Sequence, residues 1–385
     1  MTNQTLSWLY CLQKSPIFQR PHHLTNWIRK FGDKVVWYSH PRSLFGILKD
    51  MEIGILISPF RGGAKIIEEF QPENKFKVER IISSGYFPLP QKWLPDNFKK
   101  KLRLGFLSQV KNLVSPDIVL ISWAFLKSEV ELFRRMFPKA KIIFDVMDFI
   151  PAFHPYEKYL QEAFYDSLKE ADGITFINHT LVEELEKFIS APFKVIPNGV
   201  QFNESPGFAI KEGKIKKIGY FGFFANWMDF ELLMQVVKEL NDTHFVLVGP
   251  WESGLEDKKR KLMKFKNLDY RGAIPFSQIP QFLREIDLLL IPWLNNSISR
   301  FADPIKIKEA LYAGLPVIYT LPTKDPFIDS RITILSEAED ICTVIRESQF
   351  ADKKIRLQWA QEIANNYSWE KLSEEFRKFC ISLLY

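Results

Sequence analysis

The sequence predicts two successive α/β domains, each built on a doubly wound parallel sheet with helices on both faces. Its 385 residues exceed what one hydrophobic core usually supports. Short apolar segments alternate with longer helical patterns along almost the whole chain. These segments are continuously apolar, which is typical of parallel strands buried on both faces. With 46% apolar and 25% charged residues, the composition is that of a globular protein with material for two cores.

Eleven segments are expected to be strands because each is short, apolar and followed by turn residues or a helical pattern. In the first half they are LSWLYCL (6–12), KVVWY (34–38), IGILI (53–57), DIVLIS (117–122), KIIFDV (141–146) and GITFI (173–177). In the second half they are KIGYFG (217–222), HFVLVGP (244–250), LDYRG (268–272), DLLLIPW (287–293) and LPVIY (315–319).

The domain boundary is expected where Asn, Gly, Pro and Ser cluster, in the segment 198–215. This predicts an N-terminal domain over 1–200 and a C-terminal domain over 201–367. The last segment, 368–385, has the pattern of an amphipathic helix with Ser368 as its cap. It either closes the second domain or packs back onto the first.

Composition narrows the location and the partners. The three cysteines lie far apart and form neither a disulfide framework nor a zinc pattern, which suits a reducing cytoplasm. No signal sequence and no membrane-spanning apolar run is present. The net charge of +6 arises in residues 1–200, which hold 27 basic and 21 acidic residues, so this half is expected to face something anionic. No nucleic-acid-binding motif is present, and we expect no nucleic acid partner.

An anionic membrane surface is the partner that one segment suggests. Residues 92–113 combine the basic run Lys99, Lys100 and Lys101 with apolar neighbours such as Trp93 and Phe98. Basic and aromatic groups on one helix favour a membrane interface, while a solvated helix packed on its sheet fits the pattern equally well. The protein is thus expected either free in the cytoplasm or peripheral at the inner face of the cell membrane.

The segment FADPIKIKEALYAG (301–314) predicts a helix that begins with Asp303 as N-cap and Pro304 at its first position. Lys306 and Glu309 then share one face. They could form a solvated ion pair, which is common and weak. Alternatively they clamp a ligand, since a helix N-terminus attracts anions and Arg300 adds charge beside it. A carboxylate one turn further in suits the paired hydroxyls of a ribose.

Two further loops leave the expected carboxyl ends of strands, where α/β sheets bind ligands. Residues 220–233 contain one glycine at the turn, Gly222, and therefore no dinucleotide fingerprint or phosphate loop. Phe223 and Trp227 follow in the same loop, and Gly249 opens the loop after the next strand. We expect all four residues to line a donor site.

In the first half, Arg20, His22 and His23 follow the first strand. They form either a plain turn with surface histidines or a site for phosphate binding and proton transfer. Asp145 and Asp148 end another expected strand in a D-x-x-D arrangement, of which Asp145 is expected to be structural. No Cys/His/Asp cluster has metal-ligand spacing, so no metal site is expected.

The segment DPIKIKEALYAGLPVI (303–318) resembles a motif of the GT-B glycosyltransferases of the family 4 type, also called group 1. KVIPNGVQF (194–202) is similar to the interdomain signature of that family, and IGYFGFFANWMDFELL (218–233) and the terminal YSW (367–369) follow in the family's order. The resemblance covers about residues 140–370. It implies two Rossmann-like domains facing a central cleft, with the donor on the C-terminal domain and the acceptor mainly on the N-terminal one. It also implies no metal and no cofactor.

Within this resemblance, Glu309 matches the glutamate that holds the ribose. The sequence departs from the family at Phe301, where the first glutamate of the E-x7-E pattern belongs, and lacks the Arg/Lys pair that grips the diphosphate. A branch of the family with Trp-x-Asp in this loop is closer, through Trp227 and Asp229. Arg300 and Lys306, with Arg20 from across the cleft, are expected to replace the lost positive charge.

The expected function is transfer of a hexose-type sugar from a UDP- or GDP-linked donor, with retention of configuration, to a cell-envelope or polysaccharide acceptor that can be lipid-linked. Asp148 and His22 are the expected catalytic residues, and Arg20 and His23 are expected to bind acceptor or phosphate. Two alternatives remain open. One is an isomerase similar to the nucleotide-sugar 2-epimerases, which share the fold, and the other is a nucleotide-sugar-binding protein without catalysis.

Overall fold

The computed structural model describes residues 5–12, 20–39, 42–43, 65–66, 80–83, 86–87, 94–124 and 127–385. The chain forms two compact units, Met1–Ile196 with Ser373–Tyr385, and Pro197–Leu372. The first unit therefore ends four residues before the expected boundary at 200, and it includes the end of the chain.

The N-terminal unit is built on a sheet with the strand order β10-β9-β8-β7-β1-β2-β5-β4. All neighbouring strands are parallel except β4, which is antiparallel to β5. The central strand β1 lies between β2 and β7, so the chain winds outward from it in both directions. The strands are β1 (Ser7–Leu12), β2 (Lys34–Ser39), β4 (Lys65–Ile66), β5 (Arg80–Ser83), β7 (Ile118–Ile121), β8 (Lys141–Val146), β9 (Gly173–Phe176) and β10 (Phe193–Val195). A separate pair joins β3 (Arg42–Ser43) to β6 (Tyr86–Phe87).

Helices connect these strands because parallel neighbours require crossover connections. The helices are α1 (Arg20–Lys30), α4 (Asp96–Lys111), α5 (Glu129–Met136), α6 (Ile150–Phe153), α7 (Lys158–Glu170) and α8 (His179–Leu185), followed by a 3-10 turn, η2 (Glu186–Phe188). The last helix of the chain, α16 (Trp369–Ser382), contributes its part from Ser373 to this unit. Arg377 of α16 forms an ion pair with the fully buried Asp33 at 2.7 Å, which anchors the helix there.

The C-terminal unit is an all-parallel sheet of order β13-β12-β11-β14-β15-β16. Its strands are β11 (Lys217–Phe221), β12 (His244–Val248), β13 (Leu268–Tyr270), β14 (Leu288–Ile291), β15 (Val317–Tyr319) and β16 (Thr333–Ile334). Its helices are α9 (Phe230–Glu239), α10 (Glu256–Leu262), α11 (Ile279–Glu285), α12 (Ile305–Ala313), α13 (Pro326–Asp329), α14 (Ala338–Glu347) and α15 (Lys353–Tyr367), with 3-10 turns η3 (Phe276–Gln278) and η4 (Ser299–Phe301).

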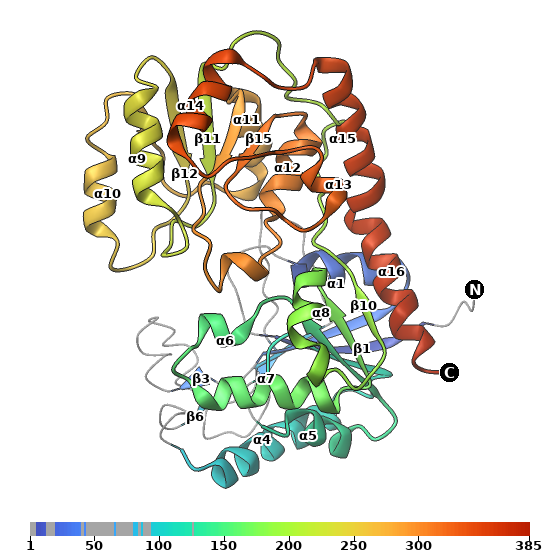
Figure 1. The fold of residues 1–385 in the computed structure, drawn as a ribbon. Coiled ribbons are helices and arrows are strands. Elements are labelled where there is room, and N and C mark those ends of the chain that lie inside the picture. Colours follow the sequence, from blue (N-terminus) through green and yellow to red (C-terminus); the bar gives the residue numbers. More distant parts are fainter. Residues whose placement is uncertain are drawn as a thin grey trace. The chain divides into compact units, whose positions relative to one another are not determined.

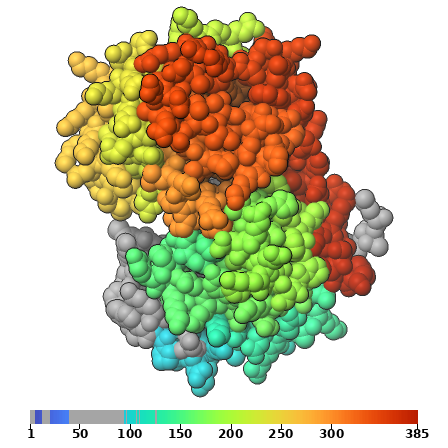
Figure 2. Space-filling view, viewed as in Figure 1, coloured from blue at the N-terminus to red at the C-terminus, as the bar shows by residue number. Residues whose placement is uncertain are grey.

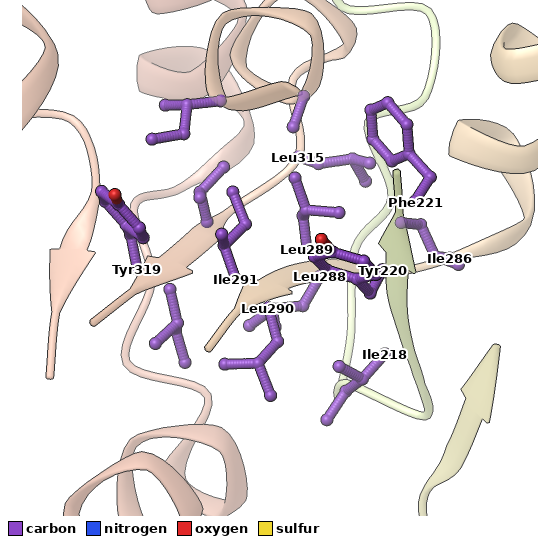
Figure 3. Packing of buried hydrophobic residues seen from close by; sticks show 14 of the residues in the cluster. Ile218, Tyr220, Phe221, Ile286, Leu288, Leu289, Leu290, Ile291, Leu315 and Tyr319 are labelled. Atoms are coloured by element: carbon purple, nitrogen blue, oxygen red, sulfur yellow. The ribbon is translucent and has the colours of Figure 1, made fainter. Parts of the chain in front are cut away.

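Helices cover this sheet in two groups. α9 packs beside α14, and α12 packs beside both α11 and α15 (Figure 1). Figure 2 shows the later segments of this unit, orange to red, over most of its viewed face, with the earlier yellow segments at its left. The strands between these layers are buried on both faces. Successive side chains of a strand point to opposite faces of the sheet, and the neighbours Leu288 and Leu289 of β14, labelled in Figure 3, are both fully buried. Each such side chain contributes about 1.5–3 kcal/mol by leaving water.

The predicted fold class is confirmed, since both units are doubly wound sheets. Ten of the eleven predicted strand segments are strands, and the segment 53–57 lies outside the described residues. The sequence reading missed β3, β4, β5, β6, β10 and β16. β10 and β16 are short edge strands with partly exposed side chains, so they lack the continuous apolar pattern. β3, β4 and β6 span two residues each, and β5 spans four, which is too short for a clear apolar pattern.

The basic segment 92–113 forms a helix only from Asp96, and Trp93 lies outside the described residues. Two of its basic side chains are buried, which an exposed basic face would not allow. Lys99 is 3% exposed, and Arg103 is 1% exposed and paired with the buried Glu129. Lys101 and Phe98 remain exposed. Within the described part of the chain, no helix has the length and apolar character that crossing a bilayer requires.

Candidate functional site

Three loops meet at the carboxyl edge of the C-terminal sheet. They follow β12, β11 and β14, which are neighbours in the sheet. A bridge joins Phe224 of the β11 loop to Trp251 of the β12 loop, and another joins Met228 to Trp293 of the β14 loop. From β11 the chain adds β12 and β13 on one side of the sheet. It then returns to the other side of β11 and adds β14, β15 and β16 there. This edge is therefore the switch point at which doubly wound sheets bind ligands.

Lys306 lies at this edge, in the first turn of α12. Its Nζ donates to the Tyr220 hydroxyl at 3.3 Å and lies over the rings of Tyr220 and Trp293, 4.7 and 4.9 Å from their centroids. Within the described residues, no carboxylate lies within salt-bridge distance of this ammonium group. The side chain therefore presents a positive charge to the edge of the sheet, held by two aromatic rings.

The two loop glycines allow the backbone to approach closely. Gly222 has φ +131°, and a Cβ there would lie 2.5 Å from Lys306 Nζ. Gly249 has φ +141°, and a Cβ there would lie 1.8 Å from the Gly222 carbonyl oxygen. Both positions favour glycine because both have positive φ. At Gly249 a side chain would also collide with the backbone of Gly222. The two loops therefore pack backbone against backbone, and the end of the Lys306 side chain lies directly against Gly222.

Glu309 lies one turn after Lys306 and is only 6% exposed. Burial raises the pKa of its carboxyl group to about 7, and the nearby Lys306 partly offsets this rise. In the part of the chain that the structure describes, this carboxylate has no hydrogen-bond partner and no ion pair. The solvated Lys306–Glu309 pair is therefore wrong as an interpretation. Burial of this side chain disfavours its charged form, and hydrogen-bond donors of a ligand would offset that cost.

The start of α12 differs from the prediction. The helix begins at Ile305, Pro304 takes the N-cap position, and Asp303 does not cap it. The Asp303 carboxylate instead accepts from the backbone N–H of Asn198 at 2.7 Å and pairs with the buried Lys308 at 2.5 Å. These two stronger partners occupy the oxygens that a cap would use. The expected helix end at Gly314 is confirmed, with φ +81°.

The remaining donor-site candidates form the rim of this edge. Arg300 is exposed on η4, and its guanidinium lies over the ring of the buried Phe301. Phe223 is 39% exposed and contacts the half-buried Trp227 at 6.0 Å between ring centroids. Asp229 caps α9 by accepting from Leu232 N–H. Their roles toward a ligand stay predictions.

In the N-terminal unit, Arg20 is buried and forms a two-pronged ion pair with Asp145 at 2.9 and 3.0 Å. It also donates to the carbonyl oxygen of Ile196. His22 and His23 are buried in the first turn of α1, with the His22 ring edge-on to Trp37 at 4.9 Å. Surface histidines are therefore wrong as an interpretation. These contacts give Arg20 a structural role, and its phosphate role stays a prediction.

Asp148 lies just past the carboxyl end of β8 and is half-buried. Burial, and secondarily the charge of Asp145, raise the pKa of its carboxyl group to about 7. Such a group exchanges protons near neutral pH. Among the described residues, no three His, Cys, Asp or Glu side chains are grouped as a metal site would need.

Sequence reasoning missed Tyr220, Trp293 and Lys308. Tyr220 and Trp293 stand at the ends of apolar segments that were interpreted as strands, and Lys308 was given no role. The position of Tyr220 and Trp293 at the ends of two expected strands was the signal available.

Two doubly wound units, with a polar site at the carboxyl edge of the C-terminal sheet, are typical of the GT-B fold of glycosyltransferases. Residues 215–350 match the family model described as Glycosyl transferases group 1. A Bacillus subtilis protein named as a teichuronic acid biosynthesis glycosyltransferase, TuaH, is 22% identical over 243 residues, which are 58% of this chain and 60% of that protein.

Solved structures agree with this class over the whole chain. Sucrose-phosphate synthase from Thermosynechococcus elongatus has a TM-score of 0.70 at 12% identity, covering 98% of this chain and 99% of that one. HepE of Anabaena, solved with UDP and glucose, has a TM-score of 0.65 at 12% identity, covering 98% and 100%. The resemblance to the GT-B glycosyltransferases is thereby confirmed.

Proposed function

We propose that this chain transfers a hexose-type sugar from a UDP-linked donor to a cell-envelope or polysaccharide acceptor. The observation that carries the proposal is the buried, unpartnered carboxylate of Glu309 one helical turn from the ammonium group of Lys306. The UDP and glucose in the HepE structure support the choice of donor. The name of the Bacillus subtilis relative supports the class of acceptor.

In this proposal Glu309 accepts hydrogen bonds from both hydroxyls of the ribose. Lys306 and the N–H groups at the start of α12 hold the diphosphate, with Arg300 at the rim. The same groups stabilise the negative charge that develops on the departing diphosphate. Gly222 leaves space for the Lys306 ammonium group, and Gly249 lets the two loops approach each other. Phe301 leaves the sugar without the usual carboxylate, so other groups must bind its hydroxyls.

Asp148 is the group that we assign to the acceptor. Its raised pKa fits a carboxylate that takes the proton of the attacking hydroxyl near neutral pH. Retention of configuration belongs to the same proposal by resemblance to the family. His22 and His23 keep their proposed roles in proton transfer and acceptor binding.

The decisive experiment measures UDP and uridine binding by calorimetry and ligand-observed NMR. Glu309→Ala should weaken both ligands about tenfold to hundredfold, because charge-assisted hydrogen bonds to the ribose are lost. Lys306→Ala should weaken UDP but leave uridine unchanged. Glu339→Ala and Lys238→Ala, both at exposed positions, are the matched controls. Wild-type affinity in Glu309→Ala would refute the ribose clamp.

Two alternatives are separated by product analysis. A 2-epimerase-like enzyme would convert UDP-linked sugar without any acceptor, whereas a transferase would only hydrolyse it slowly. A binding protein without catalysis would do neither, even with a panel of acceptors. The transferase proposal therefore requires acceptor-dependent release of UDP.

A further inference from the structure

We propose that the Tyr220 hydroxyl is a positioning group of the diphosphate site: it holds the ammonium group of Lys306 over Gly222. This inference rests on the proposed function, because it assumes that Lys306 binds phosphate. It adds a residue that belongs to the sheet rather than to the loops of the site.

Tyr220 is 1% exposed, the fourth residue of β11, and packs among side chains of β14 (Figure 3). Its hydroxyl donates to the carbonyl oxygen of Phe223 at 3.1 Å. It accepts from Lys306 Nζ at 3.3 Å and from Trp293 Nε1 at 3.5 Å. A phenol has one donor and two acceptor sites, so these three partners satisfy it completely. Its orientation is therefore fixed.

These partners come from three different segments. Phe223 belongs to the loop after β11, Trp293 to the loop after β14, and Lys306 to α12. A phenylalanine ring would fill the same buried space without the desolvation cost of a hydroxyl. Hence the hydroxyl is best explained by the three groups that it connects, which belong to the loops after β11 and β14 and to α12.

The ammonium group of Lys306 has three donors, and one goes to Tyr220. In the part of the chain that the structure describes, the other two have no hydrogen-bond acceptor. The ammonium group lies against Gly222, in the space that a side chain at this position would take. A long lysine side chain normally loses considerable rotamer freedom on binding. The hydroxyl and the two rings remove part of that freedom in advance, which favours binding of a phosphate.

The test is Tyr220→Phe, which keeps the ring and removes only the hydroxyl. We expect UDP affinity to fall about fivefold to tenfold, while uridine affinity stays unchanged. In a Lys306→Ala background, the same substitution should have no further effect on UDP, because the two changes break one interaction. Tyr38→Phe on β2 of the N-terminal unit is the matched control, since its hydroxyl is equally buried and also accepts from a basic side chain, that of Arg103 at 3.0 Å. It should leave UDP affinity unchanged.

Three outcomes would overturn the inference: wild-type UDP affinity in Tyr220→Phe, an equal loss for uridine, or additive losses with Lys306→Ala. If Tyr220→Phe melts below the assay temperature, Trp293→Phe replaces it, since it removes the second donor to the hydroxyl and weakens the ring contact with Lys306. The same UDP-selective loss is expected, and its absence also overturns the inference. If the wild type binds no UDP, the proposed function is refuted as well. If Lys306→Ala weakens UDP binding but Tyr220→Phe does not, only this inference is refuted.

Discussion

Glu309 determines, at the scale of single residues, how this protein should respond to pH. The pKa of its carboxyl group rises from its ordinary value of 4.5 to about 7 because the group is buried. The folded protein therefore holds this proton more tightly than the unfolded chain does. The resulting stability is fully present below about pH 4.5 and is lost as the pH rises through about 7.

We expect Glu309→Gln to remove this part of the pH dependence. The shift corresponds to at most about 3.5 kcal/mol, because each pKa unit is worth about 1.4 kcal/mol. The measurement is the free energy of unfolding in urea at pH 5 and pH 8, without ligand, for wild type and variant. Asp148 has a similarly raised pKa and should keep a part of the slope in the variant. Equal slopes in the two proteins would show that Glu309 is ionised at little cost.

At the scale of elements, α12 owes its position to contacts outside itself. Lys308 and Asp303 form a buried pair at 2.5 Å, and Asp303 also receives the backbone N–H of Asn198. Tyr312 donates to Glu204 O from the other end of the helix. The helix that carries Lys306 and Glu309 is thus fixed at both ends within its own unit, as a binding element must be.

The proposed membrane contact lies on α4, and only the exposed side chains of this helix can take part in it. Phe98, Lys101 and Lys111 are exposed, whereas Lys99 and Arg103 are buried. We expect wild type to float with anionic vesicles more than with neutral ones, and the double change Lys101→Glu with Lys111→Glu to abolish the preference.

Lys238→Glu with Lys264→Glu changes the net charge equally at exposed positions of the other unit. This control should keep the preference for anionic vesicles. If it loses as much binding as the α4 variant, general charge and not α4 is responsible, and the membrane proposal for this helix fails.

At the scale of the whole molecule, the proposed chemistry depends on side chains and helix ends for charge, without a metal. Transfer activity with UDP-linked sugar should therefore survive excess EDTA. Activity that disappears with EDTA and returns with Mn²⁺ or Mg²⁺ would mean that the diphosphate site has been assigned to the wrong groups.

The sequence by itself determined the fold class, because continuous apolar strands such as Leu288–Ile291 can be buried only in a sheet covered on both faces. It also singled out Lys306 and Glu309, since both stand at the start of a helix that follows a strand. Element boundaries were less accurate. Asp303 looked like a cap because capping is a local rule, but Asn198 and Lys308 compete for its oxygens, and Asn198 lies 105 residues away.

Only the tertiary structure decided which of these polar groups are buried and what they contact. The pattern of 301–314 fits an exposed ion pair as well as a clamp, and burial of Glu309 excludes the exposed pair, while the clamp stays a proposal. The sequence did not indicate Tyr220 as a site residue, since a tyrosine in an apolar strand is expected to pack in the core. Its hydroxyl has a function only through Lys306, which lies 86 residues further along the chain. Sequence patterns report local periodicity, whereas hydrogen bonds between distant segments depend on how the chain folds back on itself.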